Sequence, residues 1–335
     1  MATKPFAKFL PLGAIIQEFR VNGLNIVQNF PTMELYQKYN DPYFGETIGR
    51  VANRIFNARI NNLNGRVYPL TANNGTNCLH GGKRGWGKRM FEGPTTVHRN
   101  GHEAILFTYV SRDGEEGFPG TVELRVWYIT RTEQEQGREV YVLEVEYEAE
   151  LVGEENVQET AVAVTNHSYF NLWSAPTIEG TEVTLSTDLY QVVNQADIPM
   201  GPLASFPGVG LNKVFTLGPN GPDIDHCFIL DTNPEHVPID TRGRPLRRLG
   251  AFYHPATKIH LEVRSTEPAF QFYTGKYINV PAVGGLPARG PRSGFCIEPS
   301  RYDDAVNVDS WRGMVVLKRG QKYGSKFAYR AWHKG

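Results

Sequence analysis

The chain has 335 residues, and its 35 lysines and arginines are balanced by 35 aspartates and glutamates. A hydrophobic fraction of 40% supplies enough apolar side chains for a large core and excludes a disordered chain. The balanced charge argues against a nucleic-acid or anionic-membrane partner, because both select for a basic excess.

The chain carries no segment typical of a membrane span. Its longest stretch without charged residues, 160–178, includes side chains that hydrocarbon would not tolerate, namely Asn166, His167, Asn171 and Pro176. The apolar run within residues 1–16 is too short and too poorly flanked for a signal peptide. We therefore expect no membrane partner.

The three cysteines, Cys78, Cys227 and Cys296, are an odd and sparse set, unlike the framework of a disulfide-rich secreted protein. We therefore expect a cytosolic location. Two glycosylation-type triplets, at Asn74 and Asn166, weakly oppose it, but such triplets often arise by chance. Removal of a leader from the chain would leave secretion open.

Short elements follow one another along the chain, separated by scattered glycines and prolines, which number 34 and 22. Residues 31–39 predict two helical turns, with Pro31 near the start, where its missing N–H costs nothing. Turn signals follow at 112–114 and 134–137. Apolar side chains that alternate with polar ones predict strands, at 121–129, 139–148 and 258–264.

The alternation is typical of half-buried antiparallel strands. In 121–129 one face carries Val122, Leu124, Val126 and Tyr128, while Glu123 and Arg125 point away from it. Helical periodicity is nearly absent, and neither a propeller-type repeat nor a shift in composition divides the chain. The sequence therefore predicts one all-β domain over residues 1–335, a sandwich or something close to it.

Two glycine-rich or basic segments have weak functional interpretations. Residues 82–89 approach a phosphate-binding loop, but Arg89 stands where that motif needs a hydroxyl to hold Mg²⁺. The basic stretch 242–248 is better interpreted as a solvated loop than as an anion site. No dinucleotide fingerprint, HExxH or GxSxG motif occurs, so a Ser–His–Asp hydrolase is unsupported.

The cysteines raise a metal hypothesis, because each lies two residues from a polar group: Cys78 from His80, Cys227 from Asp225 and Cys296 from Glu298. Residues two apart on a strand share a face. A zinc site of three cysteines and a histidine usually has closely paired ligands, which this wide spacing lacks. Packing beside a polar pocket is the better interpretation, so we expect no metal.

Polar residues interrupt several otherwise apolar strands. These residues are, in chain order, Asn53 and Arg54 in 49–54, His80 in 77–82, His167 in 165–172, Asp225 in 224–230, Gln271 in 269–273 and Glu298 in 294–299. A buried charge is costly unless it is paired, so an isolated carboxylate on an apolar strand needs an explanation. Together these residues supply a histidine, two carboxylates and several neutral donors, which is what a neutral polyol ligand requires.

Several of these segments together resemble the aldose 1-epimerase family, the galactose mutarotases. The matching stretches follow the order of the family through most of the chain: YFGETIGRVANRI (43–55), LHGG (79–82), NHSYFNL (166–172), DH (225–226), QFYTG (271–275), GFCIE (294–298) and DAVN (304–307). The resemblance implies a β-supersandwich of mostly antiparallel strands. It also implies interconversion of the α and β anomers of free aldoses such as galactose and glucose, without a cofactor.

The resemblance also assigns roles. His167 matches the general acid and Glu298 the general base, and five residues match those that hold the sugar, namely Asn53, Arg54, His80, Asp225 and Gln271. One departure concerns the residues after the base, where the family often has Thr-Gln and this chain has Pro299-Ser300. Short side chains there would change the pocket wall, so the preferred aldose stays open.

The chemistry of anomer exchange suits this set of residues. The anomeric hydroxyl loses a proton while the ring oxygen gains one, so an acid and a base are needed on opposite sides of a small ring, each contributing about 10²–10⁴-fold. Histidine titrates near neutrality, and glutamate in an apolar setting gains basicity. Trp86 and Trp173 are candidate faces for stacking on a sugar, but core packing is the favoured role of both.

Three other functions remain open from the sequence. One is a non-catalytic sugar-binding protein on the same scaffold. The second is an epimerase of a phosphorylated sugar, which needs a cationic pocket built from Arg84, Lys88, Arg89 or Arg301. The third is a hydrolase or lyase that uses Asp225 and Glu298 as a carboxylate pair. The oligomeric state, monomer or dimer, is equally open.

Overall fold

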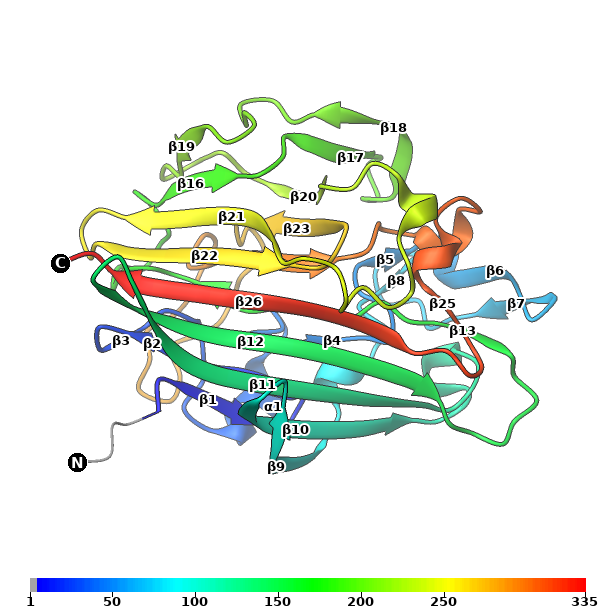
Figure 1. The fold of residues 1–335 in the computed structure, drawn as a ribbon. Helices are drawn as coiled ribbons and strands as arrows, with labels where there is room; N and C mark the ends of the chain where they lie inside the picture. The colour runs from blue at the N-terminus through cyan, green and yellow to red at the C-terminus, as the bar shows by residue number, and fades with distance from the viewer. Residues whose placement is uncertain (1–4) are drawn as a thin grey trace.

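The computed structural model describes residues 5–335, so the first four residues of the predicted domain and of the N-terminal apolar run lie outside the described part. Two large antiparallel sheets form the framework of the described chain (Figure 1). The larger has nine strands, in the order β19 (Val214–Thr216), β16 (Glu182–Leu185), β21 (Arg247–His254), β22 (Ile259–Ser265), β26 (Tyr323–His333), β12 (Arg138–Leu151), β11 (Val122–Glu135), β10 (His102–Ser111) and β9 (Glu92–Arg99).

The smaller of the two has six strands, in the order β15 (Tyr169–Phe170), β24 (Phe295–Ser300), β23 (Ala269–Tyr273), β20 (Asp225–Ile229), β17 (Leu189–Val193) and β18 (Pro199–Ser205). Short pairings surround these sheets: β1 (Ala7–Leu10), β2 (Ile15–Val21) and β3 (Leu24–Asn25); β4 (Thr47–Ile48) with β14 (Thr165–Asn166); β5 (Arg54–Ile55) with β8 (Cys78–Leu79); β6 (Arg59–Leu63) with β7 (Arg66–Pro69); β13 (Glu159–Ala161) with β25 (Val316–Lys318).

One α-helix, α1 (Met33–Tyr39), is present in the described residues, together with short 3₁₀ turns at Phe56–Ala58, Trp86–Lys88, Glu115–Gly117, Pro234–His236, Ala305–Asn307 and Arg312–Met314. The predicted helix was placed two residues too early, because Thr32 is still extended and precedes the first helical residue. No helix among residues 5–335 has the length and apolar character needed to cross a bilayer.

The main core lies between the two large sheets. Apolar side chains alternate along the strands of both sheets and point inward, as Val122 and Leu124 do from β11. Direct contact between the sheets is visible where Phe252 of β21 stacks on Phe295 of β24 with ring centroids 4.5 Å apart. Two facing antiparallel sheets with an apolar interior confirm the prediction of an all-β, sandwich-like fold.

The three predicted strands are confirmed: the third is β22, shifted by one residue, and the other two are longer than expected. Strands β11 and β12 pair over 14 residues each, from Val122 opposite Leu151 to Glu135 opposite Arg138. The turn expected at 134–137 is therefore a two-residue hairpin at Gln136 and Gly137, both with positive φ (52° and 78°). Such a turn matches the twist of the flanking strands and lets the ladder run to its end.

The last described strand lies in the middle of the larger sheet. β26 pairs with β12 on one side and with β22 on the other, although it follows both in the sequence (Figure 1). The hydrogen-bonded ladder that joins the two halves of this nine-stranded sheet therefore runs through β26.

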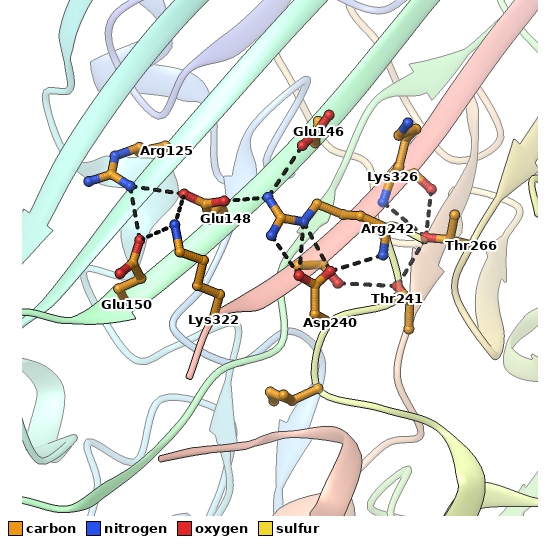
Figure 2. A network of polar contacts seen from close by, with 12 residues as sticks. Arg125, Glu146, Glu148, Glu150, Asp240, Thr241, Arg242, Thr266, Lys322 and Lys326 are labelled. Atoms are coloured by element: carbon orange, nitrogen blue, oxygen red, sulfur yellow. Dashed lines mark hydrogen bonds and ion pairs between the residues drawn. The ribbon is translucent and has the colours of Figure 1, made fainter. Parts of the chain in front are cut away.

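The outer face of β12 is covered by charged side chains. Glu146 and Glu148, which point away from the core, are nevertheless buried, with side-chain exposures of 3% and 7%. Arginine and lysine side chains from other segments lie over them and pair with them, as Figure 2 shows for Arg125, Arg242 and Lys322. The half-buried strand of the sequence prediction is buried on both faces here.

Arg242 corrects the prediction that 242–248 is a solvated loop. Its guanidinium pairs with Asp240 at 2.6 Å and with Glu146 at 3.3 Å, and also with Glu148. Arg244 pairs with Asp231 at 2.5 Å. Two of the four arginines in this stretch are thus held by carboxylates, whereas Arg247 and Arg248 begin β21 and donate to backbone carbonyls and neutral side chains.

Candidate active site

A cavity of about 770 Å³ opens at one face of the six-stranded sheet. Its floor carries Glu298 from β24, Gln271 from β23 and Asp225 from β20. Gln271 lies directly opposite Glu298, and Asp225 lies two residues before Cys227, which is opposite Gln271, so the three side chains share a face. The Gln271 amide donates a hydrogen bond to Asp225 Oδ1 at 2.7 Å.

Alternation along β24 separates the core from the site. Phe295 and Ile297 point into the core between the sheets, while Cys296 and Glu298 point to the other face. This arrangement confirms the prediction that Glu298 and the two apolar residues lie on opposite faces. It also explains how a carboxyl group reaches the cavity from a strand whose six residues are all buried.

His167 lies in the connection between β14 and β15, and hydrogen bonds of its backbone fix its position. Its N–H donates to the Glu46 carbonyl at 2.9 Å, and its own carbonyl accepts from the Gly45 N–H at 3.1 Å. The ring is 5% exposed and presents Nε2 to Glu298 Oε1 at 3.5 Å. Its other nitrogen, Nδ1, lies 3.5 Å from the Cys296 thiol.

The wall facing this floor comes from a short strand pair, β5 and β8. His80 and Asn53 both adopt left-handed backbone conformations, with φ of 53° and 56°, and the Asn53 N–H donates to His80 Nδ1 at 3.2 Å. Arg54 extends from the same wall and donates to the Asn53 side chain at 3.3 Å. It also pairs with Asp197 at 2.9 Å.

An aromatic ring links the two histidines. The Tyr43 ring centroid lies 4.9 Å from that of His80 and 5.6 Å from that of His167. Lys88 lies over the ring of Tyr43, with its Nζ 4.5 Å from the ring centroid. The same Nζ lies 2.6 Å from the buried Glu46 carboxylate. A cation is therefore fixed behind the tyrosine, outside the set of residues that line the cavity.

Burial sets the protonation of the carboxyl groups in the cavity floor. It raises the pKa of Glu298 well above its usual value, and the neighbouring charges of Asp225 and Asp303 raise it further. Burial also raises the pKa of Asp225 to about 6, although the hydrogen bond from Gln271 and the charge of Arg54 act in the opposite direction. Both groups hold a proton more tightly than an exposed carboxyl.

The histidines respond in the opposite direction to the same environment. Burial lowers the pKa of His167 to about 3 and lowers the pKa of His80 well below its usual value. The cavity without a ligand therefore favours the neutral form of His167 and the protonated form of Glu298.

All seven residues singled out from the sequence line this one cavity: Asn53, Arg54, His80, His167, Asp225, Gln271 and Glu298. Other lining residues were missed, among them two tyrosines and an aspartate. Tyr43 opens the first matching segment, and Tyr273 lies within the fifth, so both had a signal in the sequence. Asp197 lies in a loop between β17 and β18 and had none.

The cations proposed for a phosphate group lie elsewhere. Arg301 is buried in an ion pair with Glu267 at 2.6 Å, Arg89 lies 3.6 Å from Glu115, and Lys88 is held by Glu46. Arg54 is the single lysine or arginine among the described residues that line the cavity. The cationic pocket that a sugar phosphate would need is not formed by the residues proposed for it.

The tryptophans take no part in the cavity. Trp86 is buried in the main core, with 1% exposure, and Trp173 stacks on His254 at 4.4 Å. For Trp86 the packing role preferred from the sequence is confirmed. Trp173 packs beside a second, smaller hollow on another part of the surface.

The three cysteines are free and buried, as their packing interpretation predicted. They do not assemble into one site: among residues 5–335, the single group of three potential metal ligands is His167, Cys296 and Glu298. Cys78 and Cys227 lie outside this group. The zinc site of three cysteines and a histidine, which the sequence analysis disfavoured, is therefore not formed.

Comparison with known proteins gives consistent matches. A family model described as aldose 1-epimerase matches residues 5–330. The bifunctional protein GAL10 of Pachysolen tannophilus is 37% identical over 322 residues, 95% of this chain and 44% of the relative. The galactose mutarotase of Bos taurus is 37% identical over 309 residues, 89% of this chain and 81% of the relative. The chain thus spans less than half of the bifunctional relative and most of the mutarotase.

A solved structure, that of a GalM/aldose epimerase homologue from C. elegans, superposes with a TM-score of 0.81 at 24% identity. The match covers 98% of this chain and 96% of that protein. At this identity the likeness bears on the fold, and it agrees with the two-sheet architecture described above.

Proposed function

The chain belongs to the aldose 1-epimerase family, and from this premise we propose that it interconverts the α and β anomers of a free aldose. The observation that carries the proposal is the contact between His167 Nε2 and Glu298 Oε1, 3.5 Å apart on the wall of a large polar cavity. An acid and a base this close would act from the same side of the sugar, not from opposite sides as expected from the sequence, and can reach two oxygens bonded to the same carbon.

In the proposed reaction Glu298 takes the proton of the anomeric hydroxyl while His167 protonates the ring oxygen. The bond between the anomeric carbon and the ring oxygen breaks, which leaves an open-chain aldehyde. Rotation about the bond from the aldehyde carbon to C2 presents its other face. Closure then reverses both proton transfers and gives the opposite anomer.

The proton count of the pair supports this scheme. Ring opening starts from protonated His167 and ionised Glu298, and it ends with neutral His167 and protonated Glu298. Both arrangements hold one proton, so a cycle needs no exchange with water. Burial favours the second arrangement, as the pKa directions of both groups indicate. In the free cavity the proton therefore has to pass from Glu298 to His167 before ring opening starts, which costs free energy.

The remaining cavity residues suit the task of holding hydroxyl groups. Gln271 donates one hydrogen bond to Asp225, and its buried carbonyl oxygen has no partner in the protein. A buried acceptor without a partner is costly, so a sugar hydroxyl that donates to it would be bound firmly. Arg54 and Asn53 face it from the opposite wall and would limit how far the open chain moves.

A free monosaccharide, with galactose and glucose as the first candidates, fits this cavity better than its phosphate ester. The cavity is lined by one arginine and several carboxyl groups, and these carboxyl groups would repel a phosphate. No cofactor enters the scheme. We further propose that residues 1–335 form one domain, which the family match over 5–330 supports. A cytosolic location stays a prediction, and no preference is predicted between monomer and dimer.

Polarimetry on freshly dissolved α-D-galactose and α-D-glucose tests the proposal. We expect catalytic amounts of the protein to accelerate equilibration and His167→Ala or Glu298→Ala to abolish the acceleration with the fold intact. Full activity in either variant would overturn the assignment of roles. A folded wild-type protein that binds sugar without accelerating exchange would instead favour the non-catalytic alternative.

A further inference from the structure

We propose that His167, Cys296 and Glu298 form a binding site for a thiophilic divalent cation, with Zn²⁺ as the probe, and that the bound cation excludes the sugar reaction. One ligand atom from each side chain lies within 4.8 Å of the others, and all three residues are buried. The consequence for activity rests on the proposed function, whereas cation binding does not.

Two of the ligands come from β24, and the third comes from the segment just before β15, the strand that pairs with β24. Cys296 and Glu298 are two residues apart on β24 and share its cavity-side face. The His167 ring lies against both, with Nδ1 3.5 Å from the thiol sulfur and Nε2 3.5 Å from the carboxyl oxygen. A tetrahedral zinc ion with bonds of about 2.0–2.3 Å holds neighbouring ligand atoms roughly 3.5 Å apart. One ion can use only one of these nitrogens, and one ligand atom from each side chain lies within 4.8 Å of the others, so rotations that bring His167 Nε2 toward both the thiol and the carboxyl group would complete the geometry.

The ligand set suits zinc in charge and in chemical type. A thiolate and a carboxylate neutralise the two charges of the cation, and a neutral imidazole completes the set. Binding releases the thiol proton and the Glu298 proton to solvent, so the charge of the site is balanced. Mg²⁺ and Ca²⁺ prefer oxygen ligands and are expected to bind weakly here.

The surroundings favour a cation. Asp41, Asp197 and Asp225 line the same cavity, and Arg54 is the single described lysine or arginine among its lining residues. Three protein ligands leave one position of a tetrahedral ion open, and that position faces the cavity because His167 and Glu298 line it. A cation bound there occupies the nitrogen and the oxygen that the anomer exchange would use.

The first experiment measures cation binding without reference to activity. Equilibrium dialysis with Zn²⁺, and absorption spectra with Co²⁺, are compared for the wild-type protein, Cys296→Ser and Cys227→Ser. Cys227 is an equally buried thiol on β20, which is separated from β24 by β23 in the same sheet, and it serves as the matched control. We expect one ion per chain and a thiolate-to-cobalt absorption band. Cys296→Ser should lose the band and bind Zn²⁺ at least about 10-fold more weakly, whereas Cys227→Ser should match the wild type.

The second experiment measures polarimetric rates with increasing Zn²⁺ or Mg²⁺. We expect inhibition by Zn²⁺ that higher galactose concentrations relieve, and none by Mg²⁺. Absence of a thiolate band, or equal Zn²⁺ binding by the wild type and Cys296→Ser, would overturn the proposal. A wild-type protein that shows the band but no anomer exchange would leave the cation site standing and remove the proposed function.

Discussion

Two regions of this molecule bury glutamates on β-strands, and they treat them in opposite ways. On the outer face of β12, burial would raise the pKa of Glu148, but Arg242, Lys322 and Arg125 outweigh it and lower that pKa to about 2. In the cavity floor, burial raises the pKa of Glu298 well above its usual value, and the nearest charged groups are further carboxylates. The two side chains are almost equally buried, with exposures of 7% and 5%.

The difference shows that the partner, and not burial by itself, decides what a buried carboxyl group does. Glu148 contacts four cations, three of which Figure 2 shows, and is fixed as an anion, so it contributes to structure. Glu298 has a neutral histidine beside it, and the cavity's arginine, Arg54, is engaged by Asp197. A carboxyl group without a fixed cation can gain and lose a proton, which acid–base chemistry requires.

The largest expected effect comes from removing the titrating group of the cavity. Glu298→Gln keeps the size of the side chain but cannot accept the anomeric proton, so the polarimetric rate constant should fall by about 10²–10⁴-fold. Thermal unfolding should show a melting temperature no lower than that of the wild type, because a neutral amide replaces a buried ionisable group. A variant with wild-type turnover would exclude Glu298 as the base.

The converse change removes a cation from the outer face of β12. Arg242→Met leaves Glu146 and Glu148 with fewer partners in a buried setting, and we expect the free energy of unfolding at pH 7 to fall by about 2 kcal/mol. Denaturant titration measures the change. Turnover on galactose should stay at the wild-type level, so a large loss of activity would contradict the separation of the two regions.

The pH dependence should differ between the regions. The lowered pKa of Glu148 means that its contribution to stability is present above its ordinary value of 4.5 and is lost as the pH falls toward about 2. The raised pKa of Asp225 means that it gains a proton below about pH 6, which weakens its acceptance of sugar hydroxyls. We therefore expect KM to rise below that pH while the fold stays stable.

Asp225→Asn provides the control for this pH effect. Its KM should be raised at all pH values and should no longer depend on pH near 6, because the titrating carboxyl group is absent. Steady-state polarimetry from acid to neutral pH gives both profiles. An unchanged acid limb of KM in the variant would assign the effect to another group.

The smallest expected effect concerns an exposed member of the charged layer. Lys322, whose side chain is 47% exposed, pairs with Glu148 at 3.2 Å and with Glu150 at 2.9 Å. Because water screens exposed pairs, Lys322→Ala should lower the free energy of unfolding by less than about 1 kcal/mol. Denaturant titration at low and high salt should show that the loss shrinks with salt, and a loss as large as that for Arg242→Met would contradict this reasoning.

The sequence predicted local features well because they depend on neighbours in the chain. Alternation gave the faces of β11 and β12, and the interruption of apolar strands by polar residues pointed to Glu298 and Asp225. What joined these segments into one site was their resemblance to a family, since spacing within a strand does not reveal which strands adjoin.

Contacts between distant segments were beyond prediction. Arg242 pairs with Glu148 across 94 positions, so the basic stretch was taken for a solvated loop and the outer face of β12 for a half-exposed one. Asp197 approaches Arg54 from a loop with no motif, and Cys296 touches His167 across 129 positions. Each depends on sheet topology, which no local pattern encodes.

The central place of β26 has a consequence for the way the protein is made. Ribosomal synthesis delivers β12 and β22 long before it delivers β26, so the inner edges of both halves of the nine-stranded sheet wait with unpaired backbone groups. Exposed strand edges are templates for wrong pairing with other chains. Nascent molecules should therefore be most prone to aggregate, and most dependent on chaperones, just before β26 emerges.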